Sequence, residues 1–191
     1  MTSAPVMWRL GRSLPDCTSA FGAAGAALAQ RERGLGLLPG HPFLLRPDGV
    51  ADADVLAFFA SSSFKLLSEQ TRVSYAKDLR LFLSFLESQS KSWRECTSAD
   101  LLDFEHWRRR DPANPQRVSG AKFSRELAAC KKFFEWQRQR GTVVVNPAAV
   151  EQVAAWQDTG GYSLRPRDAR STRVKWLTPR AFQQWRDVGL G

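Results

Sequence analysis

The stretch "SEQTRVSYAKDLRLFLSFLESQ", residues 68–89, carries the clearest helical pattern in the sequence. Ser68 has a hydroxyl that can accept a hydrogen bond from a free amide of the first turn, so a helix is predicted to begin there. Its apolar residues are spaced four, three and four apart, at Tyr75, Leu79, Phe82 and Leu86. This spacing places them on one face, which predicts an amphipathic helix packed against other helices.

Similar patterns lie on both sides of this stretch. Three further helices are predicted to begin at Asp52, Thr97 and Ser119, and Ser119 can cap the last of them. Asp100 completes a capping-box pattern with Thr97, and Gly141 ends the last helix. The apolar stripe predicted for that last helix is Phe123, Leu127, Cys130 and Phe134. The sequence therefore predicts an all-α bundle of four or five helices over residues 50–157.

The N-terminal segment has a different composition. Residues 1–49 contain seven glycines, which interrupt regular elements, so an irregular or disordered leader is predicted. A secretory signal is the alternative for the small apolar run at 20–29, although two glycines make this run poorly hydrophobic.

The C-terminal segment divides into two parts. Residues 158–176 have the glycine and arginine content of a basic linker. Within 177–191, Thr178 and Pro179 predict the start of a helix, because the hydroxyl can cap it and proline needs no amide partner at the first position.

The positive charge is concentrated in two regions. The net charge is +9, yet residues 1–60 are neutral, with five arginines and five acidic residues. Residues 61–147 hold sixteen Lys/Arg against ten acids, a difference of +6, and residues 158–191 hold seven against three, a difference of +4. No apolar run approaches the roughly 20 residues that cross a bilayer, so the partner of these basic regions is expected to be a polyanion and not a membrane.

Motifs for catalysis and for metal or cofactor binding are absent from the sequence. The three cysteines are widely spaced, without a CxxC pair, which argues against a disulfide framework and a zinc site and favours a reducing compartment, the cytoplasm with its nucleoid. The two histidines, His41 and His106, lack metal-ligand spacing. No cofactor, metal, small-molecule ligand or catalytic residue is therefore predicted.

The outward faces of two predicted helices are basic. A period of 3.6 residues directs one set away from the core of the last helix: Lys122, Arg125, Ala129, Lys132, Trp136 and Arg140. On the helix from Ser68 the corresponding residues are Val73, Lys77, Arg80 and Ser84, with Arg72 and Ser74 beside them. Cations around a small residue fit DNA phosphates or a major groove, and a solvated helix face is the alternative.

Four stretches resemble, in order and spacing, the SAM-like core-binding domain of tyrosine recombinases, the phage integrase family. They are "LSEQTRVSYAKDLRLFLSFL" (67–86), "TSADLLDFEHWRRRD" (97–111), "VSGAKFSRELAACKKFFEWQRQRG" (118–141) and "VVNPA" (144–148). The resemblance extends over about residues 41–191. It implies a helical module that forms half of a C-shaped clamp on duplex DNA.

The resemblance also implies which residues touch DNA. They are the early positions of two helices, here Val73, Ser74, Lys77, Ala121, Lys122 and Arg125. Arg72, at the start of the first helix, and Lys132, from a basic pair common in the family, complete the candidate set. These positions overlap the outward faces that follow from helical periodicity.

The function implied is that of a DNA-binding module in site-specific DNA integration and recombination, with duplex DNA and other recombinase subunits as partners. The family's chemistry uses an arginine, a lysine, a His-x-x-Arg pair and a tyrosine nucleophile in a second domain. None of these can be placed here, so the chain is predicted not to be an enzyme on its own. Residues 177–191 resemble the first helix of that domain, which would leave Phe182 and Trp185 poorly packed. The alternative is a helical protein-interaction module that binds an acidic protein or a recombinase subunit.

Overall fold

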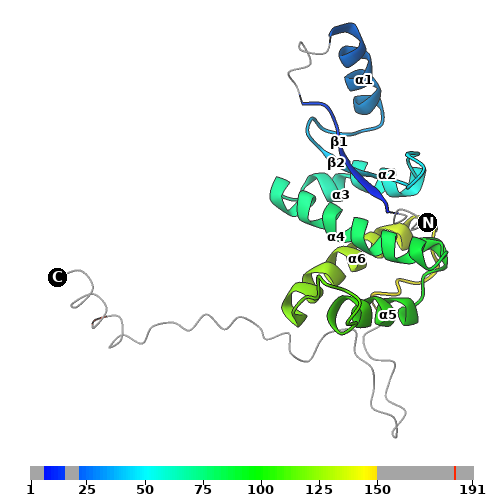
Figure 1. The fold of residues 1–191 in the computed structure, drawn as a ribbon. Helices are drawn as coiled ribbons and strands as arrows, with labels where there is room; N and C mark the ends of the chain where they lie inside the picture. Colours follow the sequence, from blue (N-terminus) through cyan, green and yellow to red (C-terminus); the bar gives the residue numbers. More distant parts are fainter. Residues whose placement is uncertain (1–6, 16–21, 150–182, 184–191) are drawn as a thin grey trace, which may run out of the picture.

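Helices dominate the structure, a computed structural model that describes residues 7–15, 22–149 and 183 (Figure 1). In chain order the elements are β1 (Arg9–Arg12), α1 (Gly22–Gly34), β2 (Pro42–Leu45), α2 (Ala53–Ala60), α3 (Ser62–Lys65), α4 (Glu69–Ser88), the 3-10 helix η2 (Trp93–Glu95), α5 (Ser98–Arg109) and α6 (Gly120–Gln139). The predicted all-α class is confirmed, with a two-stranded antiparallel sheet as the described β-structure. Among the described helices, none combines the length and the apolar character that a membrane crossing requires.

The predicted helix starts are confirmed by hydrogen bonds. The Asp52 carboxylate accepts from two amides of α2, Ser68 accepts from the Thr71 amide at 3.2 Å, and Ser119 accepts from the Lys122 amide at 3.3 Å. At the start of α5, the Thr97 amide donates to Asp100 Oδ2 at 2.7 Å, as in a capping box. These contacts satisfy donors that have no partner within the helix, which is why each helix begins where its capping residue stands.

An aromatic core joins α2, α4, α5 and α6. Phe82 of α4 lies at its centre, with its ring centroid 5.2 Å from Phe104 of α5 and 6.0 Å from Phe134 of α6. Phe58 of α2 packs edge-on against Phe133 at 5.3 Å. All five rings are fully buried, and edge-to-face packing of this kind adds to the free energy gained from burial alone.

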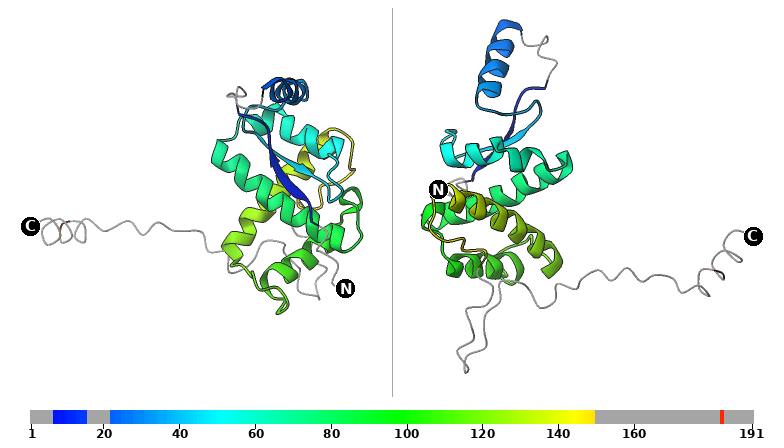
Figure 2. Two further views of the ribbon diagram at one scale, coloured as in Figure 1. Left: turned by 45° about the horizontal axis from the view of Figure 1, so that its top comes forward. Right: turned by 180° about the vertical axis from the view of Figure 1, so that it is seen from behind.

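Two paired strands and a helix lie in the segment for which an irregular leader is predicted. Strand β1 pairs antiparallel with β2, and Trp8 before it is buried against α4, where its amide donates to Ser84 Oγ at 3.0 Å and its indole donates to Glu87 at 3.3 Å. Helix α1 lies in the connection between the two strands, apart from α5 and α6 (Figure 2). The described part of residues 1–49 is therefore ordered, because a non-local strand pair and one tryptophan fix it.

The buried sector of α6 is wider than the predicted stripe. Ala129, predicted to face outward, is fully buried, and Trp136 is partly buried with its ring 5.7 Å from Phe58. On α4, Ser84 is also buried instead of outward-facing. The reason is that α6 packs against α2, α4 and α5, while the paired strands β1 and β2 cover the Ser84 side of α4. The exposed small residue in the middle of α6 is Ala128.

Several predictions fall outside the described residues. These are the end of the bundle beyond 149, the linker at 158–176, the helix at 177–191 and the packing of Phe182 and Trp185. Residues 143–149, which are described, fold back onto α6, since the Asn146 amide donates to the Lys131 carbonyl at 3.0 Å and Val143 and Ala148 join the core.

The folded state is expected to be less stable at pH values below neutral because of His41. This side chain is 1% exposed, and its Nε2 donates to the Phe59 carbonyl at 2.7 Å while its Nδ1 is buried without a partner. Burial, together with the charges of Arg72 and Lys65, holds the pKa of His41 below its usual 6.5, and this outweighs the raising effect of the Phe59 hydrogen bond. The unfolded chain therefore binds the proton more readily, and the stability present above about pH 6.5 is lost as the pH falls below it.

Urea denaturation at pH 7.5 and 5.5 measures this effect. The wild-type midpoint should drop between the two values, and His41→Gln, although less stable at pH 7.5, should show a smaller drop. His106, on the exposed side of α5, provides the matched control, and His106→Gln should keep the wild-type pH dependence. An equal drop in all three proteins would contradict the role given to His41.

Candidate nucleic-acid interface

Helix α6 exposes a basic stripe along its first three turns. Ala121, Arg125 and Ala128 are exposed at helical spacing, and Lys131 and the partly buried Lys132 follow them. Within the described residues, neither Arg125 nor either lysine forms an ion pair. The stripe ends at Glu135, one turn further along the helix. Its cations are thus available to an external anion.

Glu135 closes the stripe as a paired carboxylate. Hydrogen bonds from Arg138, at 2.7 Å, and from Asn146, at 3.4 Å, lower the pKa of Glu135 to about 2. The side chain therefore stays ionised, and its charge is balanced by Arg138 at the C-terminal end of α6 instead of by the cations of the stripe.

Helix α4 contributes a smaller set of exposed residues. Ser74 and Lys77 are exposed, and Lys77 has no ion pair within the part of the chain that the structure describes. Val73 is partly buried. Arg72 is also partly buried, because its Nη1 donates to the Lys65 carbonyl at 3.4 Å, at the end of α3. Arg72 thus lies against the α3–α4 turn, and Ser74 and Lys77 form the outward part of the α4 set.

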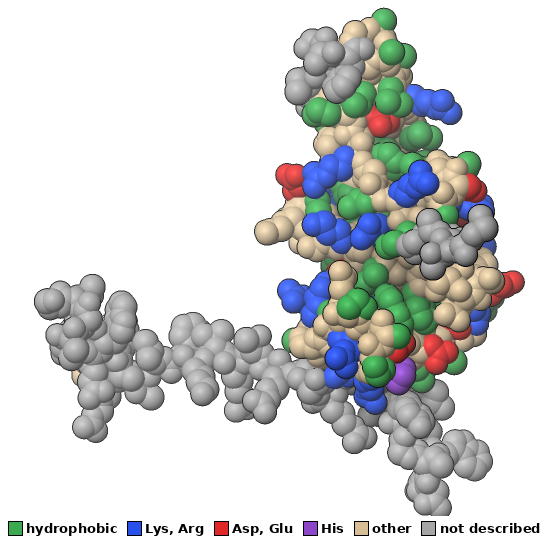
Figure 3. Space-filling model, in the orientation of Figure 1, with side chains coloured by type: hydrophobic (Ala, Val, Ile, Leu, Met, Phe, Trp, Pro, Cys, Tyr) green, Lys and Arg blue, Asp and Glu red, His purple; other side chains and the backbone are tan. Residues whose placement is uncertain are grey.

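The two sets lie on neighbouring helices. The third turn of α4 meets the first turn of α6, where Lys122 Nζ lies 2.6 Å from Asp78 Oδ1. In Figure 3, Lys and Arg side chains lie over the region of α4 and on both sides of the view, whereas most Asp and Glu side chains lie toward the right. We name the exposed Ser74, Lys77, Ala121, Arg125 and Ala128, with Lys131 and Lys132, the α4–α6 face.

Lys122 differs from the other candidate residues. Its amine contacts Asp78 at 2.6 Å and Glu126 at 3.4 Å, so both neighbours of its charge are carboxylates of this chain. Its side chain is 36% exposed. Of the eight predicted DNA-contacting residues, the structure exposes Ser74, Lys77, Ala121 and Arg125, and it leaves Arg72, Val73, Lys122 and Lys132 partly buried. Sequence periodicity offers no signal for the contact with Asp78, which is 44 residues away.

The cysteines of the core are not poised for nucleophilic chemistry. Burial raises the pKa of Cys96 to about 12, and it also raises the pKa of Cys130, which is fully buried. Both are therefore neutral thiols near pH 7, whereas the thiolate is the reactive form. In the part of the chain that the structure describes, no three His, Cys, Asp or Glu residues are grouped so that they could hold a metal ion.

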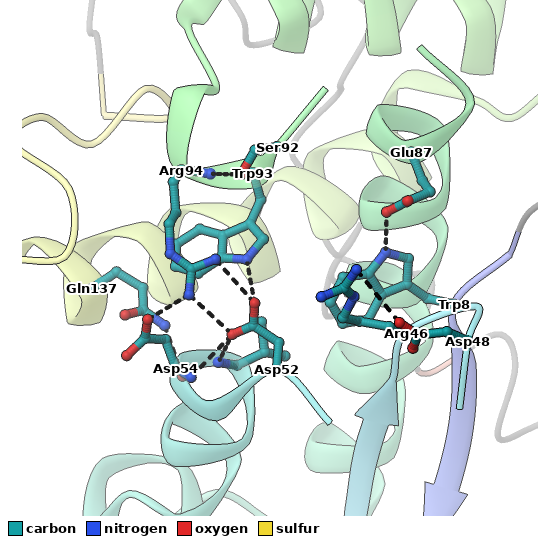
Figure 4. Close-up of polar contacts among 11 residues, drawn as sticks. Trp8, Arg46, Asp48, Asp52, Asp54, Glu87, Ser92, Trp93, Arg94 and Gln137 are labelled. Atoms are coloured by element: carbon teal, nitrogen blue, oxygen red, sulfur yellow. Dashed lines mark hydrogen bonds and ion pairs between the residues drawn. The ribbon is translucent and has the colours of Figure 1, made fainter. Parts of the chain in front are cut away.

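A pocket of about 530 Å³ lies at a different place, between Trp8, the end of α4 and η2. Its walls include Trp8, Trp93 and three cations, and each cation is paired. Lys91 pairs with Asp100 at 2.7 Å, and Figure 4 shows the pairs of Arg46 with Asp48, at 3.5 Å, and of Arg94 with Asp52, at 3.0 Å.

Arg94 makes this region a structural junction. Its guanidinium lies 4.2 Å from the centre of the Trp93 ring and bonds both oxygens of Asp52, the cap of α2. Burial by itself would raise the pKa of Asp52, but hydrogen bonds from Arg94, the Val55 amide and Trp93 hold it below its usual value. The cluster thus joins η2 to α2, and helical periodicity could not have indicated it.

Comparison with known proteins gives a family match for part of the chain. Residues 62–141 match the family described as phage integrase, N-terminal SAM-like domain. The match includes α4, α5, α6 and the whole α4–α6 face, while β1, α1, β2 and α2 precede it. Searches of curated proteins and of solved structures found no match. Residues 62–141 are therefore an N-terminal SAM-like domain of the phage integrase, or tyrosine recombinase, family.

Proposed function

We propose that the α4–α6 face binds duplex DNA and that the chain serves as the core-binding module of a site-specific tyrosine recombinase. One observation carries this proposal. Lys77 and Arg125 are exposed on adjacent helices of an integrase SAM-like domain, and within the described residues neither has a carboxylate partner. Cations without intramolecular partners are the groups that neutralise phosphates and release counterions.

The shape of the face suits close approach to a duplex. Ala121 and Ala128 are exposed on the same stripe as Arg125, so short side chains separate the cations. A helix with small residues between its basic ones can bring its backbone near the DNA, while Arg and Lys reach phosphates or base edges. The Ser74 hydroxyl adds a neutral hydrogen-bonding group on α4.

The proposed role is to hold DNA and not to cut it. In this role the module clamps the duplex at a recombination site during DNA integration, and a second domain supplies the arginine, His-x-x-Arg and tyrosine chemistry of the family. Tyr75, the one tyrosine in the described residues, packs against the core on α4, which suits a structural role. Such a module would work on nucleoid DNA in the cytoplasm, with other recombinase subunits on the same duplex.

Salt titration of DNA binding tests the proposal. Lys77→Ala and Arg125→Ala should each weaken binding and lower the slope of log K against log salt by about one, because each loses one phosphate contact. Fluorescence anisotropy with a labelled mixed-sequence duplex measures both quantities.

Arg138→Ala is the matched control, since it removes the same formal charge from α6 at a position already paired with Glu135. It should leave the slope close to that of the wild type. Absence of duplex binding by the wild type at low salt would refute the proposal, and binding to an acidic protein instead would favour an interaction module. Equal slopes for all variants would exclude Lys77 and Arg125 as phosphate contacts.

A further inference from the structure

Four charged side chains from three helices meet beneath the α4–α6 face. Lys122 Nζ lies 2.6 Å from Asp78 of α4 and 3.4 Å from Glu126 of α6. Arg108 of α5 holds both oxygens of Glu126, at 2.8 and 3.1 Å, and donates to the Gln116 carbonyl at 2.6 Å. We name Asp78, Arg108, Lys122 and Glu126 the charge cluster.

The charge cluster is balanced and largely removed from water. Two cations face two anions, so it adds no net charge to the face above it. The side chains of Glu126, Arg108 and Asp78 are 1%, 7% and 9% exposed, and Lys122, at 36%, covers them from outside. Buried charges persist only when they are paired, so the three helices must keep the spacing that these contacts require.

Three residues of the α4–α6 face are each followed in the sequence by a member of the charge cluster. Lys77 precedes Asp78, Ala121 precedes Lys122, and Arg125 precedes Glu126. Successive side chains on a helix point about 100° apart, because a turn takes about 3.6 residues. Fixing one side chain inward therefore fixes the direction of its exposed neighbour. The contact between Lys122 and Asp78 joins α4 to α6 at the level of Lys77 and Ala121.

We propose that the charge cluster positions the DNA-binding face and that Lys122 acts through Asp78 and Glu126 instead of contacting a phosphate. This inference rests on the proposed function of the face. The cluster holds α4 and α6 at the separation at which Lys77 and Arg125 engage one duplex together. Lys122, Asp78 and Glu126 are then positioning residues, and Lys77 and Arg125 are the contacts.

Asp78→Asn separates positioning from charge. The substitution removes a negative charge close to the face while keeping the size of the side chain. If only charge mattered, the duplex would bind more tightly. Loss of position predicts the opposite, weaker binding, because the amide holds Lys122 less strongly and the two helices lose their fixed spacing.

The experiment compares full-length variants by anisotropy with a labelled mixed-sequence duplex over a range of salt concentrations. Circular dichroism at the assay temperature restricts the comparison to folded proteins. Lys122→Met and Asp78→Asn are each expected to weaken binding by about tenfold at fixed salt, which equals about 1.4 kcal/mol. The salt slope should stay at the wild-type value in both variants, and Lys122→Arg should retain wild-type affinity. Lys91→Met is the control, because Lys91 is also paired with a carboxylate, Asp100 at 2.7 Å, but lies outside the α4–α6 face, and its affinity should stay at the wild-type value.

Two results would overturn the inference. A salt slope reduced by about one in Lys122→Met, with tighter binding by Asp78→Asn, would make Lys122 a phosphate contact. Unchanged affinity of the folded variants would make the cluster purely structural. If Lys122→Met does not fold, Asp78→Asn and Lys122→Gln decide between the same outcomes. A wild-type protein that binds no duplex removes the proposed function itself, and this is seen before any variant is compared.

Discussion

Replacing Arg108 with methionine is expected to destabilise the folded chain by about 3–5 kcal/mol, the typical cost of removing one partner of a buried ion pair. Glu126, 1% exposed, would lose both of its short contacts and keep only Lys122 at 3.4 Å. The Gln116 carbonyl would also lose its donor, so the connection between α5 and α6 would loosen. Burial of an unbalanced carboxylate is the main cause of the loss.

Urea denaturation followed by circular dichroism measures this loss. Arg138→Met is the control, because it removes an arginine from an exposed pair and should change stability by at most about 0.5 kcal/mol. The double variant Arg108→Met with Glu126→Leu should recover much of the stability, since an apolar pair can replace a buried ion pair. A double variant as unstable as Arg108→Met, or a loss below about 1 kcal/mol in the single variant, would contradict this account.

Trp8→Ala is expected to cost about 3–5 kcal/mol, as is usual when a buried tryptophan is truncated to alanine. Trp8 is 4% exposed and packs in the same core as Phe82 and Phe104, although it lies far from them in sequence, just before β1. Truncation would also remove the indole donor to Glu87. The loss would show that the segment with Trp8 and β1 stabilises the integrase-like domain that follows it.

Met7→Ala is the matched control for Trp8. This neighbouring residue is 37% exposed, so its truncation should change stability by less than about 0.5 kcal/mol. Denaturant unfolding of both variants measures the two effects in one protein background. Similar stability of Trp8→Ala and the wild type would contradict the packing of the strand on α4.

The sequence predicts the parts of this fold that depend on local chemistry. The caps at Ser68 and Ser119 and the core positions Leu79 and Phe82 follow from side chains and spacing within one helix, and the structure agrees with each. The pairing of β1 with β2 was not predicted, because Arg9–Arg12 pairs with Pro42–Leu45, about thirty residues later, and neither strand shows a strong alternating pattern.

For the α4–α6 face, the sequence predicted which side chains are exposed better than it predicted their ion-pair partners. Helical period places Lys77 and Arg125 outward, and both are exposed. The burial of Ala129 depends on how many helices surround α6, and the pairing of Lys122 depends on Asp78 of another helix. A single-helix pattern contains neither quantity, so the small residue of the stripe was predicted one position too late, at Ala129 instead of Ala128.

The contacts of Asn146 have a consequence for whatever the chain joins to this domain. Because Asn146 is fixed to Lys131 and Glu135 of α6, the described part of the chain ends beside the middle of α6 and not at the helix end, Gln139. That point lies beside Lys131 of the α4–α6 face, so the contacts of Asn146 fix where the chain passes this face.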